Sequence, residues 1–319
     1  MSWHVFSIPM TTRFRGITVR EGMLVQGPAG WGEFSPFLEY DARVAAPWMQ
    51  SALEAAHDGW PEPVRTSVPV NVTVPAVGPE QAHGVVASSA GCRTAKVKVA
   101  EPGQSLADEQ ARLEAVRDAL GESGRIRVDA NGGWSVDEAA AAIRALDRAA
   151  GGLEYVEQPC RTVEELAEVR RRVDVPIAAD ESIRNADDPY RVKELDAADI
   201  AVLKVQPLGG VRASLRIAEE IGLPVVVSSA LESSVGIAAG VALAAALPRL
   251  PYACGLATVQ LFTDDVVSGS LLPVDGELPV VRPAVSTAAL DRLRPGADRI
   301  AVWSARVAEI EALGQDRTP

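Results

Sequence analysis

Cysteine is scarce in this chain, and its spacing excludes two common kinds of site. The 319 residues include only Cys92, Cys160 and Cys254, which are far apart and odd in number. Such a set matches neither a disulfide framework nor the ligand spacing of a zinc site. We therefore expect three reduced thiols in or near the core, as is usual for a cytosolic protein.

Positive charge is also in the minority. The chain has 31 Lys and Arg against 43 Asp and Glu, which gives a net charge of −12. Because a nucleic-acid surface needs a basic stripe, we expect no nucleic-acid partner. This balance does not exclude a small anionic substrate, since local lysines and a metal ion can dominate the field at a site.

Long hydrophobic runs are missing as well. The stretch Val235–Leu247 is rich in Ala and too short to span a bilayer. No apolar run follows Arg13 and Arg15 near the N-terminus, so we expect no signal peptide. The chain is predicted to be cytoplasmic, with no membrane partner, and its sequence carries no visible signal of oligomeric state.

From about Pro69 onward, short apolar runs alternate with amphipathic ones. Runs rich in Val and Ile are typical of parallel strands that are buried on both faces. Strand–helix alternation implies right-handed crossovers between parallel strands, and eight such units predict an α/β fold, a (β/α) barrel catalytic domain over residues 66–286. The expected strands are Pro69–Val74, Ala95–Ala100, Arg125–Ala130, Leu153–Gln158, Pro176–Asp180, Ile200–Val205, Pro224–Ser229 and Tyr252–Leu256.

Helix signals occupy the intervals between these strands. Ser135–Glu138 and Thr162–Glu165 each have the Ser/Thr-x-x-Glu pattern of a capping box. The pair Gly209-Gly210 is expected to open a helix that runs to Glu220, and Gly222 is expected to end it.

The first 65 residues do not follow this alternation. They contain short β-like runs punctuated by Gly and Pro, followed by a helical pattern over Asp41–His57. We predict a small α+β capping domain at residues 1–65 and expect the helical tail at residues 287–319 to pack back on it. The β-like runs are Trp3–Ile8, Gly16–Arg20 and Met23–Gln26.

Charged side chains recur at the ends of successive predicted strands. The successive gaps from Lys98 through Asp129, Glu157 and Asp180 to Lys204 are 31, 28, 23 and 24 residues, each about one strand–helix unit. In a parallel barrel the carboxyl ends of the strands form one mouth, where the reactive groups lie. The motifs are Lys96-Val97-Lys98, Asp129-Ala130-Asn131, Glu157-Gln158-Pro159, Asp180-Glu181-Ser182 and Leu203-Lys204-Val205.

Asp129, Glu157 and Asp180 are expected to meet at this mouth from adjacent strands. Three oxygen ligands with open positions suit a hard cation such as Mg²⁺, with Mn²⁺ as the alternative. A helix cap or a solvated loop explains each carboxylate alone, but their joint placement favours a metal site. Three neighbouring residues can orient the ligands, although ordinary loop hydrogen bonds explain them equally well: Asn131, Gln158 and Glu181.

Lys96 and Lys98 share one face of a predicted strand, because side chains alternate along a strand. Val97 and Val99 take the helix-facing side, so we expect both lysines in the barrel interior. Burial and nearby positive charge both favour a neutral amine, which makes such a lysine a competent base. Lys204 ends a strand across the mouth from them.

This order of motifs resembles the enolase superfamily and, more narrowly, its muconate-lactonising subgroup. Within that subgroup, the segments Gly30–Pro36 and Ser228–Gly236 resemble those of the o-succinylbenzoate synthases. The resemblance implies a barrel with an N-terminal capping domain. It also implies that Mg²⁺ is bound by Asp129, Glu157 and Asp180 and coordinates a substrate carboxylate.

A mechanism is implied by the same resemblance. Lys98 would remove the proton alpha to a carboxylate and then protonate the leaving hydroxide, while Lys204 stabilises the enolate from the opposite side. The metal ion would act as a Lewis acid on the developing enediolate. The implied reaction is the syn dehydration of 2-succinyl-6-hydroxy-2,4-cyclohexadiene-1-carboxylate in menaquinone biosynthesis.

Contacts to the substrate are predicted from a smaller set of polar residues. Ser228, Ser229 and Ser233 can donate hydrogen bonds to a carboxylate near a helix start, although helix capping explains Ser233 about as well. Arg13 and Arg15 lie where members of the superfamily carry a mobile loop over the site, and solvated arginines are the ordinary alternative.

Other activities fit parts of the pattern. An N-succinylamino acid racemase also needs opposed lysines, and so does a dipeptide epimerase, although Cys254–Val259 lacks the acidic motif expected after the eighth strand of an epimerase. A mandelate-type site is excluded because every histidine precedes the second predicted strand. A Schiff-base aldolase using Lys204 and a non-catalytic barrel that keeps its metal remain as further alternatives.

Overall fold

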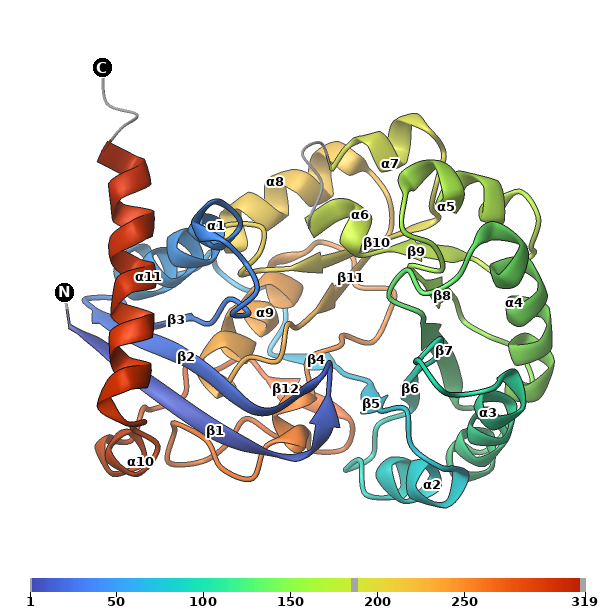
Figure 1. The fold of residues 1–319 in the computed structure, drawn as a ribbon, viewed down its shortest axis with the longest axis horizontal. Helices are drawn as coiled ribbons and strands as arrows, with labels where there is room; N and C mark the ends of the chain where they lie inside the picture. The colour runs from blue at the N-terminus through green and yellow to red at the C-terminus, as the bar shows by residue number, and fades with distance from the viewer. Residues whose placement is uncertain (1, 185–188, 316–319) are drawn as a thin grey trace.

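The N-terminal part of the molecule is a three-stranded antiparallel sheet, followed by α1 (Ala42–Leu53) and a π-helical turn at Glu54–Asp58 (Figure 1). The computed structural model describes residues 2–184 and 189–315. β1 is longer than the β-like run predicted there, because its alternation of buried and exposed residues continues to Phe14. The strands are β1 (Trp3–Phe14), β2 (Ile17–Gly27) and β3 (Gly30–Phe34).

A curved sheet of seven parallel strands follows, with helices along its outer face (Figure 1). The strand order from β5 to β11 follows the chain, as consecutive strand–helix units require. The strands are β5 (Val72–Val74), β6 (Thr94–Lys98), β7 (Arg125–Asp129), β8 (Val156–Glu157), β9 (Ile177–Ala179), β10 (Ile200–Lys204) and β11 (Val225–Ser228). The helices between and after them are α2 (Pro79–Ala87), α3 (Leu106–Leu120), α4 (Val136–Ala150), α5 (Val163–Arg170), α6 (Glu181–Arg184), α7 (Arg191–Glu194), α8 (Val211–Ile221) and α9 (Ser234–Ala246).

The predicted eighth strand, Tyr252–Leu256, is wrong as a regular strand. Isolated parallel bridges join Cys254 to Val70 and Gly255 to Ser228, so this segment spans the gap between β11 and the stretch before β5. The segment contains a glycine, which weakens a strand because it has no side chain to pack. It therefore closes the barrel through single bridges instead of a continuous ladder.

Both predicted capping boxes are confirmed. Ser135 and Thr162 cap α4 and α5, each with reciprocal bonds to the glutamate three residues later. A third box, which was not predicted, caps α3 at Ser105, with an aspartate in place of glutamate. Gly210 precedes α8 and Gly222 ends it in the left-handed conformation, as predicted.

The C-terminal helix α11 (Ala297–Gln315) lies beside α1 and the N-terminal sheet (Figure 1). The Trp303 side chain of α11 is fully buried, and its ring meets the Phe34 ring edge-on at a centroid distance of 5.9 Å. The remaining elements are the strand pair β4 (Ser67–Pro69) and β12 (Glu277–Pro279), the 3₁₀ turn Thr258–Leu261 and α10 (Thr287–Arg292). The division into a capping domain at 1–65 and a barrel at 66–286 stays a prediction.

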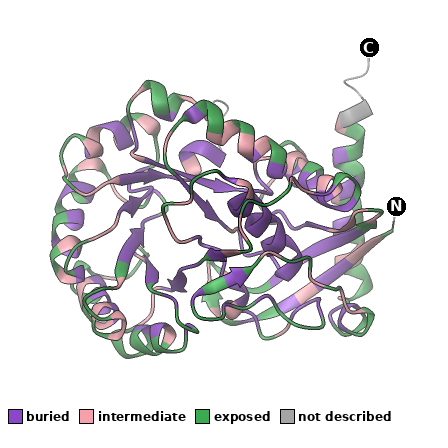
Figure 2. Ribbon diagram, turned by 180° about the vertical axis from the view of Figure 1, so that it is seen from behind, coloured by how far each residue is buried: buried purple, intermediate pink, exposed green. Residues whose placement is uncertain are grey.

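Burial is concentrated in the strands, and most barrel helices expose their outer faces (Figure 2). α9 is an exception, since its Ala-rich sequence is buried on all sides and contacts β3 of the N-terminal sheet. Within residues 2–184 and 189–315, no helix combines the length and apolar character needed to cross a membrane.

The three cysteines are buried free thiols. Burial raises the pKa of Cys92 to about 11 and the pKa values of Cys160 and Cys254 to about 12. Because the thiolate is the reactive form of cysteine, these side chains are unreactive near neutral pH.

Candidate active site

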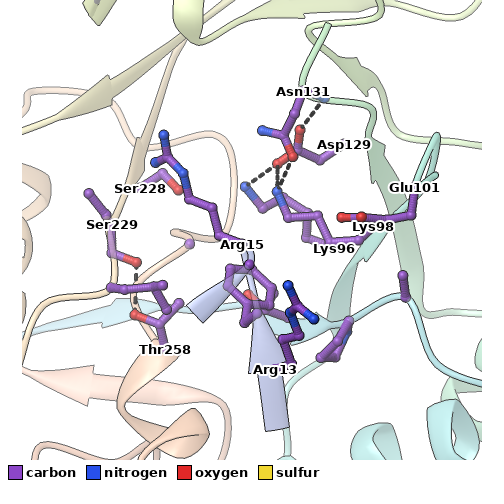
Figure 3. Close-up of a pocket in the computed structure, with 18 of the residues that line it drawn as sticks. Arg13, Arg15, Lys96, Lys98, Glu101, Asp129, Asn131, Ser228, Ser229 and Thr258 are labelled. Carbon is purple, nitrogen blue, oxygen red and sulfur yellow. Dashed lines mark hydrogen bonds and ion pairs between the residues drawn. The ribbon is translucent and has the colours of Figure 1, made fainter. Parts of the chain in front are cut away.

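A pocket of about 830 Å³ opens at the carboxyl ends of the barrel strands (Figure 3). One wall consists of residues from β6, β7, β10 and β11, and another comes from the turn between β1 and β2. The N-terminal sheet therefore contributes directly to the site. The charged lining residues include more cations than anions: Arg13, Arg15, Lys96, Lys98, Arg184 and Lys204 against Glu101, Asp129 and Glu181.

Lys96 and Lys98 project from β6 toward the acidic strand ends. Lys96 Nζ lies 3.1 Å from Glu157 Oε1 and 3.2 Å from Asp129 Oδ2. Lys98 Nζ donates to Asp129 Oδ2 and to Asn131 Oδ1, each at 2.6 Å (Figure 3). The parallel register explains this grouping, because Lys98 pairs with Asp129 across the ladder and Asp129 pairs with Glu157.

Asp180 and Lys204 form a second ion pair at the mouth. Lys204 Nζ, at the end of β10, donates to Asp180 Oδ2 at 2.5 Å. Arg184 Nε donates to the other carboxylate oxygen of Asp180 at 2.9 Å. β10 lies four places from β6 in the strand order, so Lys204 and Lys98 stand on opposite walls of the barrel.

Burial raises the pKa of all three carboxyl groups, but basic neighbours outweigh it at only two of them. Burial favours the neutral form of Asp129, but Lys98 and Lys96 outweigh it and hold its pKa well below the usual range. Burial also opposes the charged form of Asp180, yet its basic neighbours lower its pKa to about 2. Burial, reinforced by the charge of Asp129, raises the pKa of Glu157 to about 7. Both oxygens of Glu157 accept from Lys96 Nζ, so burial and not the lack of a partner is the main cause of this shift.

Lys96 and Lys204 differ in whether burial or neighbouring charge decides the direction of the pKa shift. Burial favours the neutral amine of Lys96, but the carboxylates of Glu157 and Asp129 outweigh it and raise the pKa of Lys96. Burial therefore acts on Lys96 in the expected direction, but the two carboxylates reverse the net shift. A neutral amine beside a bound metal ion stays a prediction. At Lys204 burial dominates over the attraction of Asp180, and the pKa is lowered.

The three residues considered as orienting groups form separate hydrogen bonds. Asn131 accepts from Lys98 and donates through Nδ2 to Glu181 Oε1 at 3.1 Å. Gln158 is buried, and its Oε1 accepts the backbone N–H of Asp180 at 3.0 Å. Asn131 and Gln158 have φ angles of 46° and 42°, in the left-handed region where the chain turns sharply. Gln158 thus fixes the backbone beyond β9, whereas Asn131 reaches the lysine itself.

The donor chemistry of Asp129, Glu157 and Asp180 fits a hard divalent cation. Their oxygens are buried on adjacent strands, and the raised pKa of Glu157 marks a negative charge that a cation would offset. In the part of the chain that the structure describes, no group of three or more acidic, His or Cys side chains is arranged to hold a metal ion. Ammonium groups contact the three carboxylates instead. Binding of one cation by all three carboxylates therefore requires the lysine contacts to rearrange.

The serines predicted to contact substrate divide into two groups. Ser228 and Ser229 line the pocket, and the Ser229 hydroxyl lies 2.9 Å from that of Thr258. Ser233 is fully buried, caps α9 and donates to Glu33, away from the pocket lining. Helix capping therefore accounts for Ser233 in this structure.

Arg13 and Arg15 line the pocket from the end of β1 and the turn after it (Figure 3). Arg15 Nη2 donates to the Tyr40 hydroxyl at 2.8 Å, and its guanidinium lies 4.0 Å from the centre of the Phe37 ring. The aromatic contacts hold this turn against the pocket, so Arg15 is not simply a solvated charge.

Two functional candidates were not predicted from the sequence: Arg184, which lines the pocket, and Glu33, which lies outside its lining. Arg184 follows Asp180 by four residues and returns to it after one helical turn, a spacing that was available in the sequence. Glu33 contacts Ser233, which is 200 residues away along the chain, and no local pattern indicates that contact.

Comparisons with known proteins agree with this architecture. The model for enolase C-terminal domain-like proteins matches residues 80–284, and that for enolase N-terminal domain-like proteins matches residues 5–56. The chain is 66% identical to an o-succinylbenzoate synthase of Thermobifida fusca (strain YX), with 98% of this chain and 96% of that protein covered. It is 58% identical to an o-succinylbenzoate synthase of Mycolicibacterium smegmatis, with 97% and 95% covered.

Solved structures show the same fold at lower identity. A muconate lactonizing enzyme from Pseudomonas fluorescens matches with a TM-score of 0.79 and 20% identity, covering 92% of this chain and 98% of that one. The L-Ala-D/L-Glu epimerase from Bacillus subtilis matches with a TM-score of 0.76 and 24% identity, covering 89% and 96%. Since the sequence matches extend over almost the whole chain, it belongs to the o-succinylbenzoate synthase family of the enolase superfamily.

Proposed function

We propose that the chain is an o-succinylbenzoate synthase, a hydro-lyase that converts 2-succinyl-6-hydroxy-2,4-cyclohexadiene-1-carboxylate into 2-succinylbenzoate and water. The observation that carries the proposal is the 66% identity with the Thermobifida fusca enzyme over 98% of this chain. The pocket supports it, because Lys98 and Lys204 enter from opposite walls. A role in menaquinone biosynthesis and a cytoplasmic location belong to the same proposal.

The pocket suits a small dianion. A volume of about 830 Å³ is ample for a substrate of this size. Cationic side chains outnumber anionic ones along the lining, so two substrate carboxylates find compensating charge there. The hydroxyl groups of Ser229 and Thr258 add hydrogen-bonding capacity on the wall opposite Lys98 and Asp129 (Figure 3).

Lys98 is the proposed acid and base. As a neutral amine, its Nζ takes the proton alpha to the ring carboxylate, and the electron pair left behind enters the carboxylate system. The resulting ammonium then gives that proton to the hydroxyl leaving from the neighbouring ring carbon, so water departs and the ring becomes aromatic. Both transfers occur on one face of the substrate, which makes the elimination syn.

Lys204 is proposed to stabilise the negative charge that develops when the alpha proton is removed. Its position opposite Lys98 places it on the other face of a substrate between them. A divalent cation, Mg²⁺ or alternatively Mn²⁺, would be held by Asp129, Glu157 and Asp180 and would supply Lewis-acid stabilisation of charge on the substrate carboxylate.

An N-succinylamino acid racemase is the second candidate, because two lysines on opposite walls also suit removal and return of a proton on opposite faces. An epimerase acting on dipeptides is less well supported. The acids that follow the barrel closure are engaged elsewhere: Asp264 pairs with Arg292, and Asp265 accepts from the Ser234 hydroxyl.

A paired assay tests this proposal. The purified full chain with Mg²⁺ should bleach the absorbance of the cyclohexadiene substrate, and excess EDTA should stop the reaction. The same preparation is tested for racemisation of N-succinyl amino acids and for borohydride trapping with a carbonyl substrate. Racemisation or trapping without dehydration would assign the chain to a different reaction, and metal binding without any turnover would favour the non-catalytic alternative.

A further inference from the structure

A buried polar cluster joins the N-terminal sheet to the loop that follows β11. Its members include Arg20 from β2, Glu33 from β3 and Glu232 from the loop, all at most 3% exposed. Buried charges are costly unless they are paired and hydrogen-bonded, so a cluster of this kind at a contact between two parts of the chain requires an explanation.

Arg20 makes the contacts from the sheet to the middle of the loop. Its Nε donates to the carbonyl oxygen of Leu231 at 2.8 Å, and Nη2 reaches the carbonyl oxygen of Ala230 at 3.3 Å. Nη2 also donates to the carbonyl oxygen of Ser35, and the guanidinium lies 4.5 Å from the centre of the Phe37 ring. One planar guanidinium therefore fixes two consecutive carbonyl groups of the loop.

The loop segment that Arg20 holds is part of the pocket wall. Ala230 and Leu231 both line the pocket, directly after Ser228 and Ser229. Leu231 has a φ angle of 65°, a left-handed conformation that is costly for a residue with a branched side chain. A strained residue persists only where its surroundings fix it, and the hydrogen bond from Arg20 to its carbonyl group is one such restraint.

The rest of the cluster fixes both sides of this segment. Glu232 accepts the backbone N–H of Ala230 at 2.6 Å. Glu33 accepts the N–H of Ser233 at 3.2 Å and that of Gly236 at 3.0 Å, and so anchors the start of α9. The loop is therefore held at its C-terminal end by Glu33 and in its middle by Arg20.

We propose that Arg20 is a positioning residue for substrate recognition: it holds Ala230 and Leu231 in the conformation that shapes one wall of the pocket. Arg20 does not line the pocket itself, and it acts through the loop backbone. The consequence for affinity rests on the proposed function, while the effect on the loop does not. Loss of the two carbonyl contacts should weaken ligand binding more than it slows the chemical steps at Lys98.

The main variant is Arg20→Lys. It retains the positive charge beside Glu33 and Glu232 but cannot donate to both loop carbonyl groups in the geometry of the guanidinium. Arg299→Lys is the matched control. Arg299 makes a bidentate contact with Glu21, the residue after Arg20 in β2, and neither Arg299 nor Glu21 lines the pocket. Hydrogen exchange is measured over residues 229–234. Affinity for 2-succinylbenzoate is measured by calorimetry, and KM and kcat are measured for dehydration.

In Arg20→Lys we expect exchange over residues 229–234 to accelerate and product affinity to fall, each about tenfold, which corresponds to about one charge-assisted hydrogen bond. KM should rise by a similar factor, with kcat within about threefold of the parent. Arg299→Lys should leave exchange in the loop and affinity unchanged. A lower melting temperature with unchanged loop exchange would overturn the proposal, and so would faster exchange with unchanged affinity. Failure of the parent chain to bind 2-succinylbenzoate would reject the proposed function, and loop exchange would then decide the role of Arg20.

Discussion

Lys98 Nζ lies 2.6 Å from Asp129 Oδ2, so the proposed base and a proposed metal ligand are in direct contact. An ammonium group has no lone pair to accept a proton, and Lys98 acts as a base only after it has lost one. Lys96 Nζ also lies 3.2 Å from Asp129 Oδ2, so a cation bound through this oxygen would share it with both lysines. The proposed base and the proposed metal site are therefore coupled through one carboxylate.

Replacement of Lys98 tests the proton-transfer role. Lys98→Ala should reduce kcat for dehydration by about a thousandfold or more, since general acid–base groups contribute about 10²–10⁴ in rate. Lys193→Ala is the control, because Lys193 is exposed and donates to the carbonyl oxygen of Glu220. Circular dichroism checks that both variants fold, and parent-like turnover in Lys98→Ala would remove this residue from the mechanism.

Replacement of Asp180 tests the metal site. Asp180→Asn keeps the shape of the side chain but removes one negative charge, so the dissociation constant for Mg²⁺ should rise at least about tenfold. Titration calorimetry with Mg²⁺ measures this, with Asp264→Asn as a control, because Asp264 pairs with Arg292 instead. If the Asp180 variant titrates like the parent, Asp180 is not a ligand.

The mouth of the barrel was accessible from the sequence because its geometry follows two local periods. The strand–helix repeat places Asp129 and Lys204 at the same end of the sheet, and strand alternation places Lys96 and Lys98 on one face. Regular elements are fixed by patterns of this kind, which is why the capping boxes were also predicted correctly. The contacts formed by Lys96, however, depend on which carboxylates are nearest in space.

Contacts between distant parts of the chain were not accessible. Glu33 and Ser233 are 200 residues apart, and Arg20 and Leu231 are 211 apart. No helical or strand period extends over such separations, so the cluster arises from tertiary packing alone. The prediction of an eighth strand was wrong for a related reason. The segment around Cys254 pairs with its neighbours only through isolated bridges, and tertiary packing decides whether a segment pairs continuously.

Glu33 should make stability depend on pH. Burial, with Glu232 nearby, raises the pKa of Glu33 from 4.5 to about 7. The folded chain then holds a proton that the unfolded chain has already lost, so this contribution to stability is complete below about pH 4.5 and disappears as pH rises through about 7. Relative to Glu33→Gln, which cannot titrate there, the parent should lose about 2–3 kcal/mol between pH 4.5 and 8. Urea unfolding at several pH values measures the difference, and a difference independent of pH contradicts the raised pKa.

Arg112 should hold the backbone of Lys98 in the position that catalysis requires. It is only 1% exposed, and its guanidinium donates to the carbonyl oxygens of Lys98 at 2.9 Å and Val77 at 2.6 Å. Arg112→Met removes these bonds, which should lower kcat about tenfold because a base held loosely spends less time in the reactive geometry.

Arg117→Met is the matched control for that change. Arg117 lies on the same helix, α3, and also binds backbone carbonyls, but those of Ala150, Gly121 and Gly124, which are outside the pocket lining. Both variants should have a lower melting temperature because each removes hydrogen bonds from an arginine to backbone carbonyl groups. Only Arg112→Met should lose kcat. If the two variants were equally destabilised and lost kcat equally, general loosening of α3, and not the bond to Lys98, would control the rate.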